Sequence, residues 1–225
     1  MMNNKKISVI IPAFNEQEKI GDIITELKDL QFELKIIVVD DGSSDDTSKI
    51  ATKFGAFVVK HILNLGQWAA LRTAFRIALM NDVDVVVALD ADGQHFPREL
   101  TSVVAPILAE EADIVIGSRF LNFEKPDMHR HRSIGIKFFN YLMNIRTGLM
   151  LTDCTSGFKA YRREVLSALL PHLKENQYGA LEILLKAHKL GARIHEVPIS
   201  TMKTSRSSKG TLTYAYNLIR TYFSS

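Results

Sequence analysis

Residues 83–92 have the sequence VDVVVALDAD, an apolar run that ends in two aspartates one residue apart. A run of β-branched and other apolar residues is typical of a strand buried on both faces of a parallel sheet. Residues i and i+2 of an extended chain project to the same side, so Asp90 and Asp92 could face one cation. Aspartates after a strand also form ordinary turns, so the pair alone leaves a metal site and a turn both open.

The segments on either side of this run repeat an alternation of strand and helix. We predict strands over residues 7–13, 35–39, 56–60, 84–89 and 113–117. We predict helices between them, over residues 15–30, 45–55, 67–80 and 97–111. Asn15 with Glu18 resembles a capping box, which would open the first helix. This alternation predicts an α/β fold, a single Rossmann-like domain with a mostly parallel central sheet and helices on both faces.

The second half of the chain is less regular. We predict helices over residues 133–149, 163–170 and 178–190, and a strand over residues 193–199. The polar segments 121–132 and 201–210 are predicted to be flexible loops. Residues 211–223 have helical apolar spacing, so this amphipathic segment could lie on a membrane surface or pack against its own domain. We therefore divide one domain, 1–225, into residues 1–119, 120–210 and 211–225.

Composition narrows the class of protein. The chain has 225 residues, and 46% of them are hydrophobic, which is enough for a sizeable core. Its net charge is only +3 and it has no basic stripe, which argues against nucleic acid as a partner. Its one cysteine, Cys154, excludes an internal disulfide and is expected to be a small buried side chain in a reducing compartment. We expect a cytoplasmic location, because the start does not resemble a secretory signal and no window is apolar enough to span a membrane. The oligomeric state stays open, a homo-oligomer included.

Polar and acidic residues follow three of the predicted strands. They are Asn15 and Glu16, the segment 40–45 with the sequence DDGSSD, and the segment 90–95 with the sequence DADGQH. Ligands of open α/β sheets bind beyond the carboxyl ends of the strands, where these residues should meet. Carboxylates brought together repel, and Mg²⁺ typically takes one or two carboxylates plus substrate phosphates. The chain has no Gly-x-Gly-x-x-Gly after its first strand and no Walker lysine loop, which argues against dinucleotide oxidoreductases and P-loop enzymes.

Four segments, in this order and spacing, resemble the family 2 glycosyltransferases, whose nucleotide-sugar-binding fold is called GT-A. They are residues 9–16 (VIIPAFNE), 38–47 (VVDDGSSDDT), 64–66 (NLG) and 89–95 (LDADGQH). The resemblance implies that residues 1–119 bind a nucleoside diphosphate sugar. It implies that the base and ribose contact Pro12, Phe14, Glu16 and Asp41. It further implies that the diphosphate contacts Asp90, Ala91, Asp92 and Gln94, with Mg²⁺ or Mn²⁺ held by Asp90, Asp92 and Gln94. We interpret Asp45, Asp46 and Thr47 instead as helix-capping residues.

Later segments resemble the polyprenyl-phosphate glycosyltransferases, a group that includes dolichyl-phosphate mannose synthase. They are residues 116–119 (IGSR), Arg132, residues 152–160 (TDCTSGFKA) and residues 196–199 (EVPI). The resemblance implies that residues 120–210 form the acceptor half, in which Arg119 and Arg132 hold the acceptor phosphate. It also implies that Arg206 and Lys209 lie on a loop that closes over the donor sugar nucleotide. Gln67 and Trp68 depart from that group, in which small or basic residues commonly follow the glycine; Trp68 is expected in the core or in a pocket wall.

Acceptor chemistry gives these residues their expected roles. A phosphate monoester is already anionic at neutral pH, so it needs positioning and charge compensation, which the planar fork of arginine supplies, and no general base. Each arginine taken alone would more often be a surface ion pair, and it is the neighbouring motifs that favour the functional role. Asp153 could be the base for a hydroxyl acceptor, or it could orient its loop and Lys159, the role we favour. The expected catalytic residues are Asp92, Arg119, Arg132 and Asp153.

The expected reaction is a metal-dependent, inverting transfer of one sugar from GDP-mannose or a UDP-hexose to a polyprenyl or dolichyl phosphate. It would take place at the cytoplasmic face of a membrane, by peripheral contact or through a membrane-spanning partner. One alternative is a family 2 transferase that acts on a saccharide hydroxyl in glycan synthesis. Another is a nucleotide-sugar-binding protein without catalysis. A nucleotidyltransferase is disfavoured because no glycine-rich, lysine-containing loop follows the first strand.

Overall fold

The structure is a computed structural model that describes residues 5–122, 130–173 and 179–202. Within these residues, seven strands form one sheet in the order β3-β2-β1-β4-β6-β5-β7. The strands are β1 (Ile7–Ala13), β2 (Leu34–Asp40), β3 (Phe57–Lys60), β4 (Val85–Ala88), β5 (Ile114–Ser118), β6 (Lys159–Arg162) and β7 (Ile194–Pro198). Every pairing is parallel except those of β6, which runs antiparallel to both β4 and β5. The prediction of an α/β fold with a mostly parallel sheet is confirmed.

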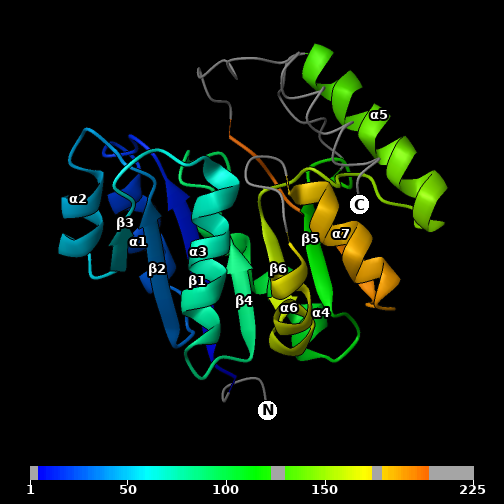
Figure 1. The fold of residues 1–225 in the computed structure, drawn as a ribbon, viewed down its shortest axis with the longest axis horizontal. Coiled ribbons are helices and arrows are strands. Elements are labelled where there is room, and N and C mark those ends of the chain that lie inside the picture. Colours follow the sequence, from blue (N-terminus) through cyan, green and yellow to red (C-terminus); the bar gives the residue numbers. More distant parts are fainter. Residues whose placement is uncertain (1–4, 123–129, 174–178, 203–225) are drawn as a thin grey trace.

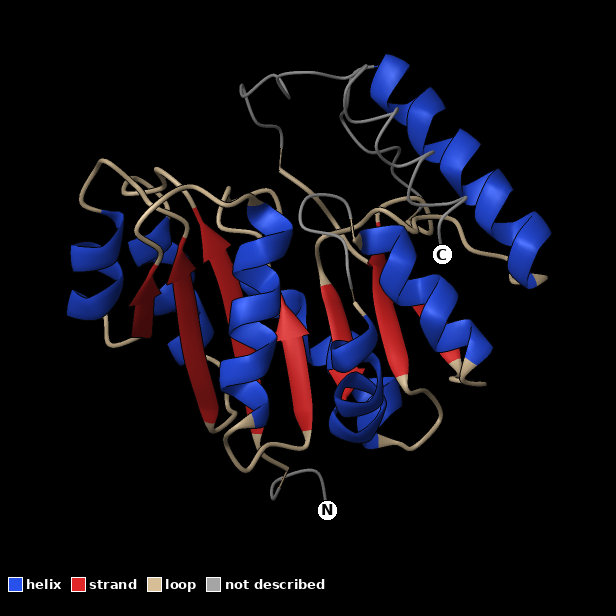
Figure 2. Ribbon diagram, viewed as in Figure 1, coloured by secondary structure: helices blue, strands red, loops and turns tan. Residues whose placement is uncertain are grey.

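Helices cover both faces of the sheet (Figures 1 and 2). They are α1 (Ile20–Lys28), α2 (Thr47–Lys53), α3 (Gln67–Leu79), α4 (Leu100–Leu108), α5 (Arg130–Thr147), α6 (Arg163–Leu169) and α7 (Ala180–Lys189). Two short 3-10 turns, η1 (Pro97–Glu99) and η2 (Leu170–His172), precede α4 and follow α6. Among these helices, none is both long enough and apolar enough to cross a membrane.

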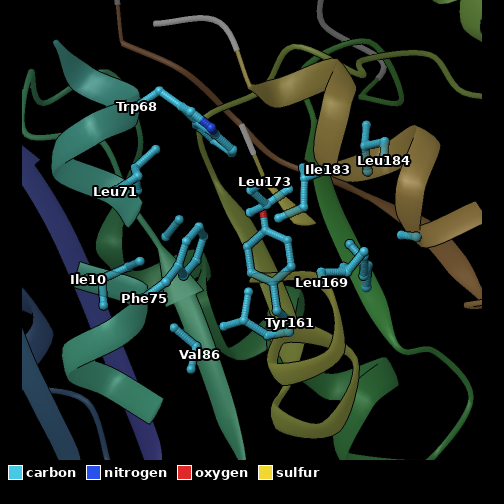
Figure 3. Close-up of a cluster of buried hydrophobic side chains, with 14 of the residues drawn as sticks. Ile10, Trp68, Leu71, Phe75, Val86, Tyr161, Leu169, Leu173, Ile183 and Leu184 are labelled. Carbon is cyan, nitrogen blue, oxygen red and sulfur yellow. The ribbon is translucent and has the colours of Figure 1, made fainter. Parts of the chain in front are cut away.

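Two apolar cores explain the unbroken hydrophobic strands. Alternate residues of each central strand point to opposite faces, so Ile10 and Val86 join the core under α3, α6 and α7, while Val9 and Val87 join the core under α1 and α4. Figure 3 shows the first core, in which Phe75 packs edge-on against Tyr161 with ring centroids 5.3 Å apart. Both faces of the sheet are therefore dry, which is what the run at residues 83–89 predicted.

Trp68 lies at the upper end of this first core (Figure 3). Its ring meets Phe75 edge-on, with centroids 6.3 Å apart, and a Cβ added to Gly179 would lie 1.8 Å from its indole nitrogen. The expectation that Trp68 belongs to the core is confirmed. Cys154 is likewise buried, and burial raises the pKa of its thiol to about 12, so it behaves as a small apolar side chain.

Three predicted boundaries are wrong. Helix α1 begins at Ile20, because Asn15 has a positive φ of 54° and its side-chain oxygen accepts a hydrogen bond from the Ser44 backbone. The predicted loop 121–132 ends earlier, since α5 already begins at Arg130. The loop predicted to start at residue 201 starts later, because Thr201 still forms an antiparallel bridge with His95, in the segment that follows β4. No prediction placed β6, the antiparallel strand inserted between β4 and β5.

Candidate active site at the carboxyl edge of the sheet

The loops that follow β1 and β2 are bound to each other at the carboxyl edge of the sheet, the upper edge in Figure 1. The backbone N–H of Asn15 donates to Ser43 Oγ at 2.9 Å, and that of Glu16 donates to Thr47 Oγ1 at 2.9 Å. The Asp45 carboxylate accepts from the backbone of Thr47, the first residue of α2, at 3.0 Å, as the capping interpretation expected. Asp46 is the N-cap residue of α2, but its side chain makes no capping hydrogen bond, so the interpretation was wrong for Asp46. This edge is therefore one hydrogen-bonded unit built from two separate loops.

The residues expected around the base and ribose differ in exposure. Pro12 is buried within β1, in register with Val39, so it can shape only the floor of a site. Phe14 exposes 44% of its surface at the mouth of the same edge, and Glu16 is half-buried beside it. An exposed aromatic ring on a rigid strand end is suited to stacking on a base.

Asp41 is buried, and both of its oxygens already have partners. Oδ1 accepts a hydrogen bond from the Leu65 backbone at 2.9 Å and lies 2.8 Å from Nδ1 of His61, while Oδ2 accepts from the Gly66 backbone at 2.7 Å. The other ring nitrogen of His61 lies 3.0 Å from Thr73 Oγ1 on α3. Asp41 thus fixes the loop that leads into α3, and its direct contact with a nucleotide stays a prediction.

Asp90 and Asp92 lie in the loop after β4, as expected. Gln67, the first residue of α3, donates to Asp90 Oδ1 at 2.7 Å. Burial, followed by the charge of Asp92, raises the pKa of Asp90 to about 6. A Cβ on Gly157 would lie 1.8 Å from Asp90 Oδ2, so the 152–160 segment packs directly against this carboxylate. Ala91, between the two aspartates, is buried in the core under α1 and α4.

Gln94 is bound to Asp92. Its backbone donates to Asp92 Oδ1 at 2.9 Å, and its side-chain nitrogen donates to Asp92 Oδ2 at 2.6 Å. Of the side-chain atoms of Gln94, the amide oxygen is the one whose chemistry suits a cation. No group of three or more His, Cys, Asp or Glu side chains suited to a metal occurs among the described residues. The carboxylates of Asp90 and Asp92 nevertheless fit Mg²⁺ or Mn²⁺, since burial and then the charge of Asp92 raise the pKa of Asp90, and Mg²⁺ commonly uses one or two carboxylates and takes its other oxygens from phosphate and water.

Arg119 and Asp153 form a buried ion pair on the other side of Asp90. Arg119 Nε donates to Asp153 Oδ2 at 2.6 Å and Nη2 donates to Oδ1 at 2.7 Å, a bidentate arrangement; the Arg119 backbone adds a third bond at 3.1 Å. The guanidinium is 5% exposed and the carboxylate is fully buried. Because both oxygens of Asp153 accept from Arg119, the geometry supports an orienting role for this carboxylate over that of a free base.

The loop that carries Asp153 is fixed from two further elements. Glu196 of β7 accepts from the backbones of Thr152 and Asp153 at 2.7 and 2.8 Å. Asn140 of α5 accepts from the Cys154 backbone at 2.9 Å and donates to the carbonyl of Thr152. This loop is therefore positioned by two side chains that come from distant parts of the sequence.

Lys159 places a buried positive charge between the two sides of the site. It lies on β6 in register with Ala88 of β4, and its ammonium donates to the carbonyl of Ser156. Burial lowers its pKa to about 8, while the charges of Asp153 and Asp90 act in the opposite direction. Lys159 therefore interacts with both the Asp90 side and the Asp153 side, which makes the two sides one electrostatic unit.

The structure brings together the predicted residues of both halves at one edge, although some predicted residues lie outside the described part. The backbone of Arg132 is in the first turn of α5, and its side chain is not described. Arg206, Lys209 and the predicted helix 211–225 lie outside the described residues.

Four positioning residues escaped prediction: His61, Gln67, Asn140 and Glu196. Glu196 belongs to a quoted motif, so its position could have been noticed, whereas His61 and Asn140 carry no sequence signal.

This arrangement defines an α/β transferase with paired carboxylates facing a buried arginine. Residues 8–170 match the model of glycosyl transferase family 2, so the chain belongs to that family and is a glycosyltransferase.

The chain is 32% identical to the UDP-N-acetylglucosamine–dolichyl-phosphate N-acetylglucosaminyltransferase of Methanococcus voltae, over 93% of this chain and 91% of that protein. It is 34% identical to the undecaprenyl-phosphate mannosyltransferase of Micrococcus luteus, over 87% of this chain and 83% of that protein.

Among solved structures, the fold is similar to the glucosyl-3-phosphoglycerate synthase of Mycobacterium tuberculosis in complex with Mn²⁺, UDP-glucose and phosphoglyceric acid. The TM-score is 0.77 at 26% identity, over 98% of this chain and 79% of that one. The prediction of the family and of the GT-A fold is confirmed.

Proposed function

We propose that this enzyme transfers one sugar from a nucleoside diphosphate sugar to a polyprenyl phosphate, with inversion at the anomeric carbon. The observation that carries the proposal is the juxtaposition of Asp90 and Asp92 with the buried Arg119–Asp153 pair, joined by Lys159. The relatives named as dolichyl-phosphate and undecaprenyl-phosphate transferases support this acceptor class. The donor is a UDP-hexose or GDP-mannose, and the reaction takes place at the cytoplasmic face of a membrane.

Each side of the site would supply one part of the reaction. On the donor side, the nucleotide lies along Phe14, Glu16 and Asp41, and the diphosphate lies near Asp90, Asp92 and Gln94. A divalent cation bound by these last residues would neutralise the charge that develops on the leaving diphosphate. On the acceptor side, Arg119, held in a fixed orientation by Asp153, would bind the lipid phosphate and align its oxygen with the sugar. Arg132 would be the second arginine on the acceptor phosphate, while Arg206 and Lys209 would bind the donor nucleotide sugar.

No proton transfer is required in this scheme, because the attacking oxygen of a phosphate monoester is already anionic. The buried cations Arg119 and Lys159 compensate that negative charge as it approaches the carboxylates. Such preorganised charges act strongly where they are buried, as Arg119 and Lys159 are.

The test is a transfer assay with the full-length protein, detergent-solubilised polyprenyl phosphate and a panel of UDP- and GDP-sugars, with and without Mn²⁺. We expect a metal-dependent glycolipid from one nucleotide class, and loss of at least about a hundredfold in rate for Asp92→Asn. Absence of glycolipid with every donor, or an Asp92→Asn variant as active as the parent, would refute the proposal.

A saccharide-hydroxyl acceptor is the alternative that the assay must separate. In that reaction Asp153 would be the base, and Arg119→Lys would leave the acceptor KM nearly unchanged, because Arg119 would not contact the acceptor. With a lipid phosphate acceptor, Arg119→Lys should raise the acceptor KM, because lysine cannot reproduce the bidentate fork. Calorimetry that shows nucleotide binding without turnover on any acceptor would favour the non-catalytic alternative.

A further inference from the structure

Helix α5 has two apolar faces, and among the described residues only one of them is packed against the rest of the protein. Ile136, Phe139 and Met143 are buried on the inner face. On the opposite side, four large apolar residues at positions i, i+4, i+7 and i+11 form what we call the outer stripe. They are Ile134 (68% exposed), Phe138 (47%), Tyr141 (63%) and Ile145 (63%). At 3.6 residues per turn these four positions lie within about 60° of one another, so they form one continuous strip.

The charges on this helix are all of one sign. Residues 130–147 contain four cationic residues and no aspartate or glutamate; the cations are Arg130, Arg132, Lys137 and Arg146. An apolar strip on a helix rich in Lys and Arg is the pattern of helices that lie in the plane of a membrane interface. Two copies of the chain packed through this stripe would bring like charges together, whereas an anionic lipid surface is complementary to them.

The inner face of α5 is attached to the site. Asn140 is hydrogen-bonded to the backbones of Thr152 and Cys154, the two residues that flank Asp153. A helix is about 10–12 Å across, so the outer stripe lies roughly one helix diameter from the loop that orients Arg119. Figure 1 shows α5 beyond the carboxyl ends of the strands, at the same edge as the acidic loops.

We propose that the outer stripe of α5 docks the enzyme on an anionic lipid surface and so presents the Arg119 side of the site to a phosphate in that surface. The choice of a lipid partner rests on the proposed function, whose acceptor is a membrane lipid. Met150, just beyond the end of α5, is a further exposed apolar residue, at 90%. Binding uses the apolar strip for insertion and the flanking cations for attraction to the headgroups.

The test is co-sedimentation of the full-length protein with vesicles of phosphatidylcholine alone or mixed with phosphatidylglycerol. The variant Phe138→Glu/Tyr141→Glu is compared with the control Phe57→Glu/Met80→Glu, which changes two exposed apolar residues on β3 and at the end of α3. We expect the parent and the control to bind anionic vesicles equally, and the α5 variant to bind at least about tenfold more weakly. Binding should also weaken as salt is raised.

Folding and transfer are measured on the same proteins. The α5 variant should keep the parent's thermal midpoint and its transfer rate to detergent-solubilised acceptor, yet lose rate with acceptor embedded in vesicles. An unchanged vesicle affinity overturns the inference. A parent that is dimeric by light scattering and becomes monomeric on substitution, without any vesicle binding, would assign the stripe to a second copy and also overturn it. Failure of transfer with every acceptor refutes the proposed function only, because vesicle binding is measured without turnover.

Discussion

The donor side and the acceptor side of this site are built by different kinds of interaction. Around β1 and β2, neutral and acidic side chains bind neighbouring backbones, as Ser43 does for Asn15 and Asp41 does for Leu65 and Gly66. Around β5 and β6, buried charges do the positioning, through the Arg119–Asp153 pair and Lys159. The neutral contacts of the donor side can be lost singly, because each such hydrogen bond contributes only about 1 kcal/mol. The acceptor side is intolerant, because losing one partner leaves a buried charge unpaired.

The largest effect should come from breaking the buried pair. Arg119→Met or Asp153→Leu should each lower the free energy of unfolding by about 3–5 kcal/mol, because the remaining charge stays buried without its partner. The double variant Arg119→Met/Asp153→Leu should cost much less than the sum. Urea unfolding of the four proteins gives the coupling energy directly. Additive losses would show that the pair is not the main partner of either group.

The contact between the two sides can be tested at Gly157. Its replacement by alanine would place Cβ 1.8 Å from Asp90 Oδ2, so Asp90 or the 152–160 segment must move. We expect a loss of about 1–3 kcal/mol in stability, typical of overpacking, and weaker Mn²⁺-dependent nucleotide binding. The control is Gly135→Ala in α5, where nothing lies within 4 Å of the added atom, and which should be neutral or slightly stabilising. Equal behaviour of the two variants would argue against the close approach.

A second aspartate–arginine ion pair, formed by Asp113, is more exposed than the Arg119–Asp153 pair and can be compared with it. Asp113 pairs with Arg193 at 2.9 Å and with Arg162 at 3.1 Å, and the hydrogen bond from Arg193 is the main cause that lowers the pKa of Asp113 to about 2. Because the folded-state pKa is depressed, this stabilisation is complete above about pH 4 and disappears as the pH falls towards 2.

Asp113→Asn should therefore cost about 1–2 kcal/mol at pH 7 and little at pH 2. Urea unfolding at several pH values measures this. The control is Asp82→Asn, which removes the ion pair between Asp82 and Lys6. The Asp82 side chain is 88% exposed, so this variant should have almost no effect at any pH. A cost for Asp113→Asn that does not change with pH would contradict the assignment.

The smallest effect is expected from removing the single hydrogen bond that the uncharged side chain of Gln67 donates to Asp90. Gln67→Leu removes the 2.7 Å hydrogen bond to Asp90 Oδ1 and should weaken Mn²⁺-dependent nucleotide binding by roughly fivefold, or about 1 kcal/mol. Fluorescence of Trp68, the one tryptophan of the chain, can report binding from the adjacent position. The matched control is Gln17→Leu, which removes a glutamine that contacts Asp46 at the same edge. Equal affinities for the two variants would show that Gln67 does not position Asp90.

Much of the site could be predicted because strand ends are local features. The apolar runs and the polar residues directly after them specify which side chains reach the carboxyl edge, and Asp90, Asp92, Glu16 and Arg119 all lie there. The missed strand β6 has only four residues, KAYR, and one buried lysine, so it lacks the apolar run by which the other strands were recognised. The capping assignment for Asn15 was wrong because its side chain binds Ser44, 29 residues away.

The sequence by itself determined the class of fold, the family and the acidic pair at residues 90 and 92, because these depend on patterns of neighbouring residues. Only the tertiary structure decided that Asp153 binds Arg119, that Asn140 and Glu196 hold the loop between them, and that Lys159 is buried between two carboxylates. These contacts join residues 12 to 44 positions apart, or interleave an antiparallel strand with parallel ones. Such pairings depend on the packing of the whole sheet and its helices, which no local pattern of residues encodes.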